Sequence, residues 1–165
     1  MRIIELISIL LCLTGCLQQP PLKTGLEGKK IPSFTFQLID STTLLNTDGI
    51  KEGRPFIVFY FDPSCPHCRA ELRDIINHNK DFKNVSFYMF TTFPYKAVKH
   101  FSDEFNLEAY PNFTIGIDYT DYLYKYFSIP KVPFLAFYDK KKCLNQVLVG
   151  KTDYKTIQTQ YQSIE

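Results

Sequence analysis

Cys65-Pro66-His67-Cys68 lies between two segments whose hydrophobic patterns differ. The continuous apolar run at residues 55–61 predicts a central strand that is covered on both faces. After the first cysteine, apolar residues recur at helical spacing, so a helix is expected to begin there. Two cysteines separated by two residues can close a disulfide and exchange two electrons with another protein. The pattern therefore predicts a dithiol at the N-terminus of a helix.

The predicted helix gives the two thiols different surroundings. Cys68 falls on the apolar stripe that Leu72 and Ile75 continue, so we expect it to be buried. Cys65 is expected at the helix start and facing outward, where unpaired N–H groups and the positive end of the helix dipole favour a thiolate. Pro66 suits the first helical turn, where a missing N–H group costs nothing.

The composition indicates one globular domain with its own core. The chain has 165 residues, of which 45% are hydrophobic and 22% are charged. Its formal net charge of +2 is too small to indicate a nucleic-acid partner. The basic run at residues 140–142 is interpreted as a solvated turn.

The N-terminus is predicted to be a targeting segment rather than part of the fold. Residues 3–13 are mostly apolar but too short to span a bilayer, as in a signal peptide. Residues 13–16, Leu-Thr-Gly-Cys, resemble the lipobox of bacterial lipoproteins, which implies cleavage and lipid attachment at Cys16. We therefore predict a signal peptide at 1–15 and a lipidated tether at 16–30, outside the cytoplasm. The alternative is an ordinary secretory signal with an incidental cysteine.

Alternating strand and helix patterns fill residues 31–165, the predicted domain. Their order, with a final hairpin and helix, favours an α/β layer sandwich with a mixed sheet. Strands are expected at 34–38, 44–45, 55–61, 85–90, 113–117, 133–138 and 144–149, and helices from 66 onward and around 97–105, 119–127 and 154–161, with Asp118 capping the third helix.

A strand, a Cys-x-x-Cys, a helix and a distant proline that opens a hairpin together resemble the thioredoxin fold. More narrowly, the chain is similar to the TlpA/ResA-like envelope thiol–disulfide oxidoreductases. It shares their N-terminal strand extension, a long interval between Cys68 and Pro133, and a glutamate, Glu71, three residues after the second cysteine. The resemblance implies a three-layer α/β/α sandwich with a central insertion.

The resemblance also assigns roles to residues. It implies that Cys65 is the attacking thiol and that Cys68 is the resolving thiol. Val132 and Pro133 match the dipeptide with a cis bond that presents backbone to the substrate. Pro130 competes for this role, but the apolar strand begins at Pro133.

Two residues near the cysteines have more than one interpretation. Glu71 would accept or relay the proton of Cys68, or would only offset the helix dipole or pair with Arg73. His67 would stabilise the Cys65 thiolate, or would simply face solvent. Pro-His between the cysteines resembles the oxidase DsbA, whereas the surrounding chain resembles reductases, so the direction of electron flow stays open.

The predicted partners are thiols and disulfides of envelope proteins, an upstream redox partner and a membrane, with no cofactor and no metal. Cys143 is interpreted as a structural thiol, with a resolving role as the alternative. Three other functions are weighed against the oxidoreductase: a peroxiredoxin-like peroxidase, a metal site built on the cysteine pair, and a lipid-anchored binding module whose cysteines are redox-silent.

Overall fold

The computed structural model describes residues 21–164. Its strands are β1 (Thr35–Leu38), β2 (Leu44–Asn46), β3 (Phe56–Tyr60), β4 (Ser86–Thr91), β5 (Phe113–Ile117), β6 (Phe134–Tyr138) and β7 (Leu144–Val149). Its α-helices are α1 (Pro66–Asn77), α2 (Tyr95–Glu104), α3 (Tyr122–Phe127) and α4 (Tyr154–Gln162), and short 3₁₀ turns lie at Thr47–Gly49, Asn79–Phe82 and Leu107–Ala109.

The strands form one mixed sheet in the order β2-β1-β5-β4-β3-β6-β7. Strands β3, β4 and β5 are parallel to one another, whereas β6 runs antiparallel to β3 and β7 antiparallel to β6. Strand β5 lies between β1 and β4, so the segment between the cysteines and Pro133 contributes two neighbouring strands, β4 and β5, to the sheet. This arrangement is the mixed α/β sandwich predicted from the sequence.

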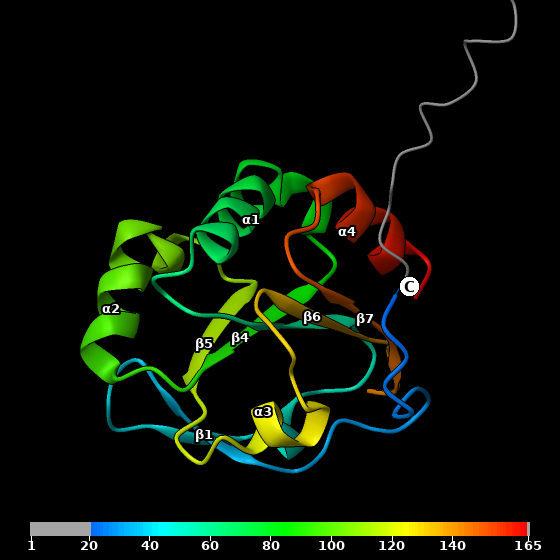
Figure 1. The fold of residues 1–165 in the computed structure, drawn as a ribbon, viewed down its shortest axis with the longest axis horizontal. Helices are drawn as coiled ribbons and strands as arrows, with labels where there is room; N and C mark the ends of the chain where they lie inside the picture. The colour runs from blue at the N-terminus through cyan, green and yellow to red at the C-terminus, as the bar shows by residue number, and fades with distance from the viewer. Residues whose placement is uncertain (1–20, 165) are drawn as a thin grey trace, which may run out of the picture.

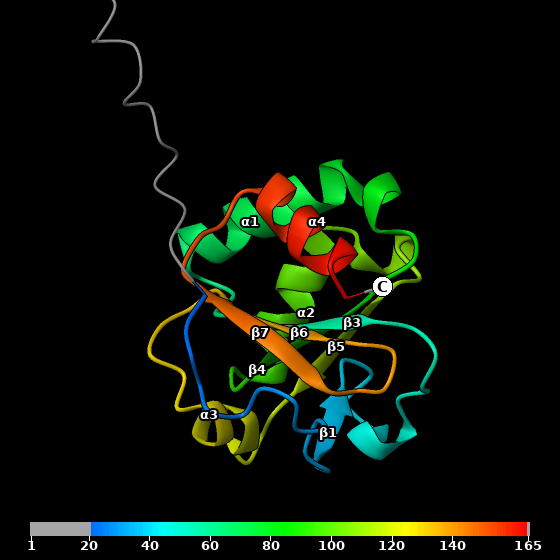
Figure 2. The same ribbon diagram turned by 90° about the vertical axis from the view of Figure 1, so that its right-hand side faces the viewer.

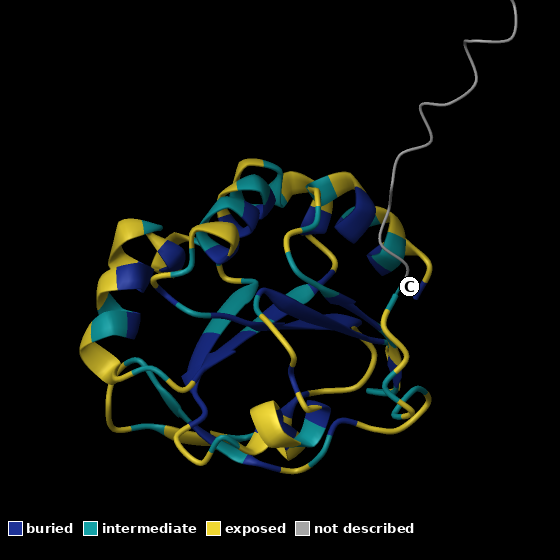
Figure 3. Cartoon of the chain, viewed as in Figure 1, coloured by how far each residue is buried: buried dark blue, intermediate teal, exposed yellow. Residues whose placement is uncertain are grey.

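Helices cover both faces of the sheet (Figure 1, Figure 2). Side chains from α1, α2 and α4 pack on one face, against residues such as Ile57 and Phe59 of β3. Leu123 and Phe127 of α3 pack on the other face, together with N-terminal residues. All five residues of β3 are buried, as expected for a strand covered on both sides (Figure 3).

The predicted elements match the observed ones closely, with one instructive difference. Helix α3 begins at Tyr122, three residues later than expected, and Asp121 rather than Asp118 occupies its N-cap position. The buried Asp118 carboxylate nevertheless accepts hydrogen bonds from the N–H groups of Tyr122 (2.8 Å) and Leu123 (2.9 Å). It caps the helix from the end of β5 rather than from within the helical sequence.

Residues 22–31, most of which were predicted to be a tether, run along the outer edge of β7. The N–H group of Leu22 donates to Val147 (3.2 Å), and that of Leu144 donates to Lys29 (2.8 Å). This segment therefore covers an edge of the sheet. Among residues 21–164, no helix has the length and apolar character needed to cross a bilayer.

Candidate active site

Cys65 lies where β3 gives way to α1. It occupies the N-cap position of α1, and Pro66 is the first helical residue. The loop before it is fixed locally, because the Asp62 carboxylate accepts hydrogen bonds from the N–H (2.7 Å) and hydroxyl (2.6 Å) groups of Ser64. The Cys65 N–H donates to the Asp62 carbonyl (3.1 Å). Cys65 is half-buried and packs against the core on one side.

Cys68 lies directly behind Cys65, on the buried face of α1. Its exposed fraction is 0%, and it belongs to the same core cluster as Leu72 and Ile75. Burial raises the pKa of the Cys68 thiol, and a hydrogen bond with the Cys65 side chain raises it further. Both cysteines are free thiols in this structure. The site therefore pairs an accessible sulfur with a neutral, protected one.

Glu71 lies one turn beyond Cys68 and is completely buried. Its Oε2 accepts a hydrogen bond from the Thr152 N–H (2.5 Å), while its Oε1 has no hydrogen-bond partner within residues 21–164. Burial raises the pKa of Glu71 to about 8, although the Thr152 N–H and Lys151 oppose the shift. The nearby Glu71 carboxylate in turn contributes to the raised pKa of Cys68. Glu71 can thus hold or release a proton near neutral pH, close to the buried thiol.

Arg69 joins the cysteine loop to α2. Its guanidinium donates a hydrogen bond to the Pro63 carbonyl (2.9 Å) and forms an ion pair with Glu104. The same group lies over the rings of Phe101 (5.7 Å) and Phe105 (5.4 Å). Arg69 therefore holds the loop that precedes Cys65 against a neighbouring helix.

The Val132–Pro133 peptide bond is cis, and it is the one cis bond in the described part of the chain. It lies beside the end of β3, because Phe134 pairs with Tyr60 in the sheet. The Pro133 carbonyl accepts a hydrogen bond from the Gly150 N–H (2.8 Å). The dipeptide thus lies at the same end of the sheet as the start of α1.

Solved structures share this architecture. DsbF of MTB, in mixed oxidised and reduced forms, superposes with a TM-score of 0.68 at 16% identity, covering 87% of this chain and 99% of its own. A secreted disulfide oxidoreductase of Mycobacterium tuberculosis, homologous to E. coli DsbE, gives 0.65 at 19% identity, covering 79% and 95%. A peroxiredoxin-like protein from Aquifex aeolicus gives 0.67 at 15% identity, covering 88% and 90%.

The chain has the thioredoxin-like fold. No family model matches the sequence, and no curated protein matches it. Since dithiol oxidoreductases and peroxiredoxin-like proteins match the thioredoxin-like fold about equally well, the fold alone does not choose between their activities.

Within the thioredoxin-like fold, Cys65, Cys68 and Glu71 come together on α1, and the cis bond lies at the same end of the sheet. Pro66 and His67 are exposed at the helix start. Cys143 lies in the β6–β7 turn, where its N–H donates to Asp139, and does not join the pair. Cys16, the predicted lipidation site, lies outside the described residues.

Two residues for which the sequence predicted no role, Thr152 and Arg69, also contribute to the site. Thr152 meets Glu71 across 81 residues, so no local pattern indicates the contact. Arg69 had a signal, because an arginine directly after Cys68 projects toward the loop that precedes the helix. Residues 21–164 contain no group of three or more His, Cys, Asp or Glu side chains arranged to hold a metal ion.

Proposed function

We propose that this protein is a thiol–disulfide oxidoreductase that exchanges disulfides with other proteins through Cys65 and Cys68. The observation that carries the proposal is the contrast between the two sulfurs. Cys65 is reachable at a helix N-terminus, while Cys68 is fully buried one turn further along the same helix. An accessible attacking sulfur with a protected resolving sulfur behind it is the arrangement that two-step exchange requires.

In the reducing direction, the Cys65 thiolate attacks one sulfur of a partner disulfide. A mixed disulfide forms, and the first partner sulfur leaves as a thiolate. Cys68 then loses its proton and attacks the Cys65 sulfur, which closes the Cys65–Cys68 disulfide and releases the second partner sulfur. Two electrons pass from the dithiol to the partner, and the reverse sequence oxidises a partner dithiol.

We assign Glu71 the role of proton acceptor and donor for Cys68. With burial raising its pKa to about 8, the carboxyl group can change protonation state near neutral pH. Its Oε1, which lacks a partner among the described residues, leaves one acceptor position free. The raised pKa of Cys68 means that the resolving step needs such an acceptor.

The neighbouring residues complete the proposed site. Val132 and Pro133 would present backbone groups to the partner chain beside the cysteines. Pro66 starts the helix, and the exposed His67 would stabilise negative charge on Cys65 and so influence the direction of electron flow.

We further propose that the protein works outside the cytoplasm, anchored by lipid on Cys16, and acts on thiols and disulfides of envelope proteins. The lipobox-like residues 13–16 support the anchor, and a similar fold in a secreted disulfide oxidoreductase supports the compartment. The chain would then hold its dithiol near a membrane and receive electrons from, or pass them to, a second redox protein there.

The test is a trapping experiment with the Cys68→Ser variant. Without the resolving sulfur, Cys65 is expected to accumulate mixed disulfides with partner proteins, visible on non-reducing gels and reversed by dithiothreitol. A Cys65→Ser variant, which retains only the buried sulfur of the pair and keeps Cys143 as Cys68→Ser does, serves as the matched control and should trap nothing.

The reduction potential of the Cys65–Cys68 couple indicates the direction of electron flow between this protein and its partners. A value near about −270 mV indicates a reductase and one near about −120 mV an oxidase. Rapid peroxide consumption that requires Cys65 would instead indicate a peroxidase. A binding module is indicated if partner binding survives with serine at both positions and no mixed disulfide forms.

A further inference from the structure

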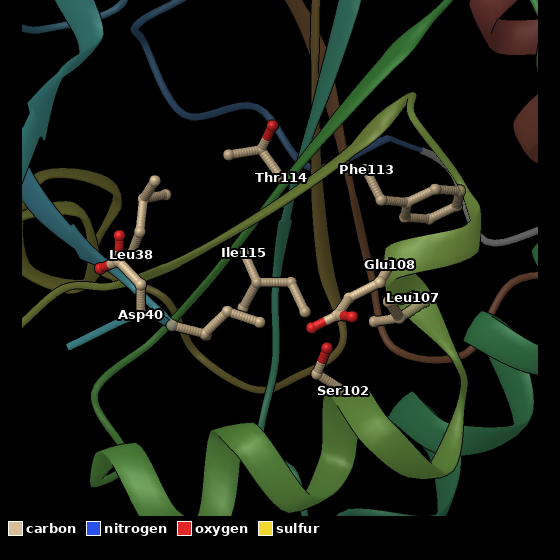
Figure 4. Close-up of a pocket in the computed structure, with 9 residues that line it drawn as sticks. Leu38, Asp40, Ser102, Leu107, Glu108, Phe113, Thr114 and Ile115 are labelled. Atoms are coloured by element: carbon tan, nitrogen blue, oxygen red, sulfur yellow. The ribbon is translucent and has the colours of Figure 1, made fainter. Parts of the chain in front are cut away.

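A cavity lies away from the cysteines, at the side of the sheet where β1 meets β5. Its volume is about 290 Å³. The end of α2, the 3₁₀ turn Leu107–Ala109, the first residues of β5 and the turn after β1 form its walls (Figure 4). Five of its nine lining residues are apolar: Leu38, Ile39, Leu107, Phe113 and Ile115.

The cavity exists because β1 leaves β5 early. Strand β1 pairs with Ile117 and Gly116 of β5 and with no earlier residue of that strand. The chain then turns at Asp40, whose carboxylate accepts hydrogen bonds from the N–H groups of Thr42 (2.9 Å) and Thr43 (2.8 Å). On the other side, Phe113 is held by stacking on Phe87, with ring centroids 4.7 Å apart. Both walls are therefore fixed by contacts that do not involve a ligand.

The hydroxyl group of Ser102 provides a buried hydrogen-bonding group in the wall of the cavity. Ser102 is 1% exposed, and its Oγ has no hydrogen-bond partner within residues 21–164. The hydroxyl points toward the side chains of Ile115 and Glu108, which also line the cavity (Figure 4). A buried hydroxyl without a partner is unfavourable, and native structures rarely retain one without a reason. A group that enters the cavity can supply the missing partner.

The rim of the cavity is acidic. Hydrogen bonds from Thr43 and Thr42 lower the pKa of Asp40 to about 2, so its carboxylate is charged at neutral pH. The Glu108 carboxylate lies on the opposite side, with the Lys99 ammonium 3.9 Å away from it. None of the residues that line the cavity is basic. Negative charge at the mouth disfavours an anionic ligand.

We propose that this cavity binds a small, mainly apolar molecule that carries one uncharged hydrogen-bonding group, which pairs with the Ser102 hydroxyl. The volume is at the lower end for small-molecule sites, which suits a single ring or a short branched chain. The site is separate from the proposed dithiol chemistry and does not depend on it.

Benzyl alcohol is the probe that fits this description, and benzoate is its charged counterpart. In a titration of the reduced, ¹⁵N-labelled protein followed by NMR, benzyl alcohol should shift the amide signals of residues 38–40, 107–108 and 113–115 saturably. We expect a dissociation constant on the order of 1 mM, as for a ligand of this size. Benzoate should bind at least about tenfold more weakly because of the acidic rim.

Two variants separate the proposed contact from general apolar binding. Ser102→Ala should weaken benzyl alcohol about fivefold, because one hydrogen bond is lost, and should leave toluene unaffected. It should also raise the melting temperature of the free protein, because the unpaired hydroxyl is removed. Ser163→Ala, which changes an exposed serine at the end of α4, is the control and should leave the affinity for benzyl alcohol unchanged.

Ile39→Trp, which fills the cavity from its rim, should abolish binding of the probe. The proposal is overturned if these signals show no saturable shift with benzyl alcohol, or if the protein and Ser102→Ala bind it with equal affinity. An extended peptide that adds to the edge of β5 with Ser102-independent affinity would also overturn it, in favour of a protein-binding surface.

Discussion

Glu71 lies wholly inside the protein, yet only one of its two carboxylate oxygens has a hydrogen-bond donor within residues 21–164. Burial therefore favours the protonated form, with a pKa of about 8 in place of 4.5. Between these two pH values the unfolded chain releases a proton that the folded protein retains. Stability from this group is present in full below about pH 4.5 and decreases as the pH rises through about 8.

The Glu71→Gln variant tests this sign. Glutamine cannot ionise, so the variant does not lose stability as the pH rises. Its free energy of unfolding relative to that of the parent protein should therefore increase between pH 5 and pH 9, by on the order of 3 kcal/mol. Urea denaturation at both pH values measures the difference, and other titrating groups cancel in the comparison. Glu108→Gln, at an exposed position, is the control. A difference between Glu71→Gln and parent that is the same at both pH values would contradict the assigned burial cost.

The sequence predicts the surroundings of one site residue better than those of another. The burial of Cys68 follows from its place on the apolar stripe of a single helix. The complete burial of Glu71 does not, because its cover comes from the segment around Thr152, 81 residues away. The sequence likewise does not predict the buried, unpartnered Ser102 hydroxyl, because the residues around its cavity come from three separate segments of the chain.

At the scale of the elements, the hydrophobic pattern predicted the strands and α-helices, because almost all of them bury an apolar face; the short, exposed β2 is the exception. It did not predict the order of the strands. The place of β5 between β1 and β4 depends on pairings between distant segments, which leave no local pattern. The late start of α3 has a similar cause, because Asp118 at the end of β5 caps the helix from outside it.

Arg69 links α1 and the loop before Cys65 to α2. Replacing it with methionine keeps most of the aliphatic stem but removes the ion pair with Glu104, the hydrogen bond to Pro63 and the guanidinium contacts with the rings of Phe101 and Phe105. We expect Arg69→Met to lower the free energy of unfolding by roughly 1 kcal/mol, measured by urea denaturation. Lys99→Met, which removes an exposed ion pair with Asp103, should have little effect. Equal losses in the two variants would show that the ring and carbonyl contacts of Arg69 contribute nothing.

Gly116 allows β1 to pack closely on β5. A Cβ atom at this position would lie 2.4 Å from Cδ2 of Phe36 and 3.0 Å from Cε1 of Phe90. Gly116→Ala should therefore reduce the free energy of unfolding by about 1–3 kcal/mol, as overpacking does elsewhere. Gly49→Ala has no atom within 4 Å of the added carbon and serves as the control for the substitution itself. Thermal denaturation of both variants tests the prediction, and unchanged stability of Gly116→Ala would contradict it.

At the scale of the whole molecule, the two edge strands of the sheet differ in length and in exposure. Strand β2 at one margin has only three residues, and Leu44 and Leu45 on it are exposed. The other margin, β7, is six residues long and is covered by residues 22–31. Unpaired strand edges are templates for association with other chains.

Removal of residues 21–30 should therefore make the protein self-associate. The N–H and C=O groups of β7 that now bond to this segment would be free to pair with a second copy. Sedimentation velocity across a range of concentrations, compared with a chain that begins at residue 21, measures the effect. A shortened chain that sediments as a monomer at every concentration would count against it.

The segment of residues 22–31 along β7 also limits how copies of this protein could form a polymer. Growth by strand pairing requires two free sheet edges on every molecule, each able to pair with an edge of a neighbouring copy. Because residues 22–31 occupy the β7 edge, only the short β2 edge is free. Pairing of the β2 edges of two copies would give a closed dimer and would not extend into a fibre.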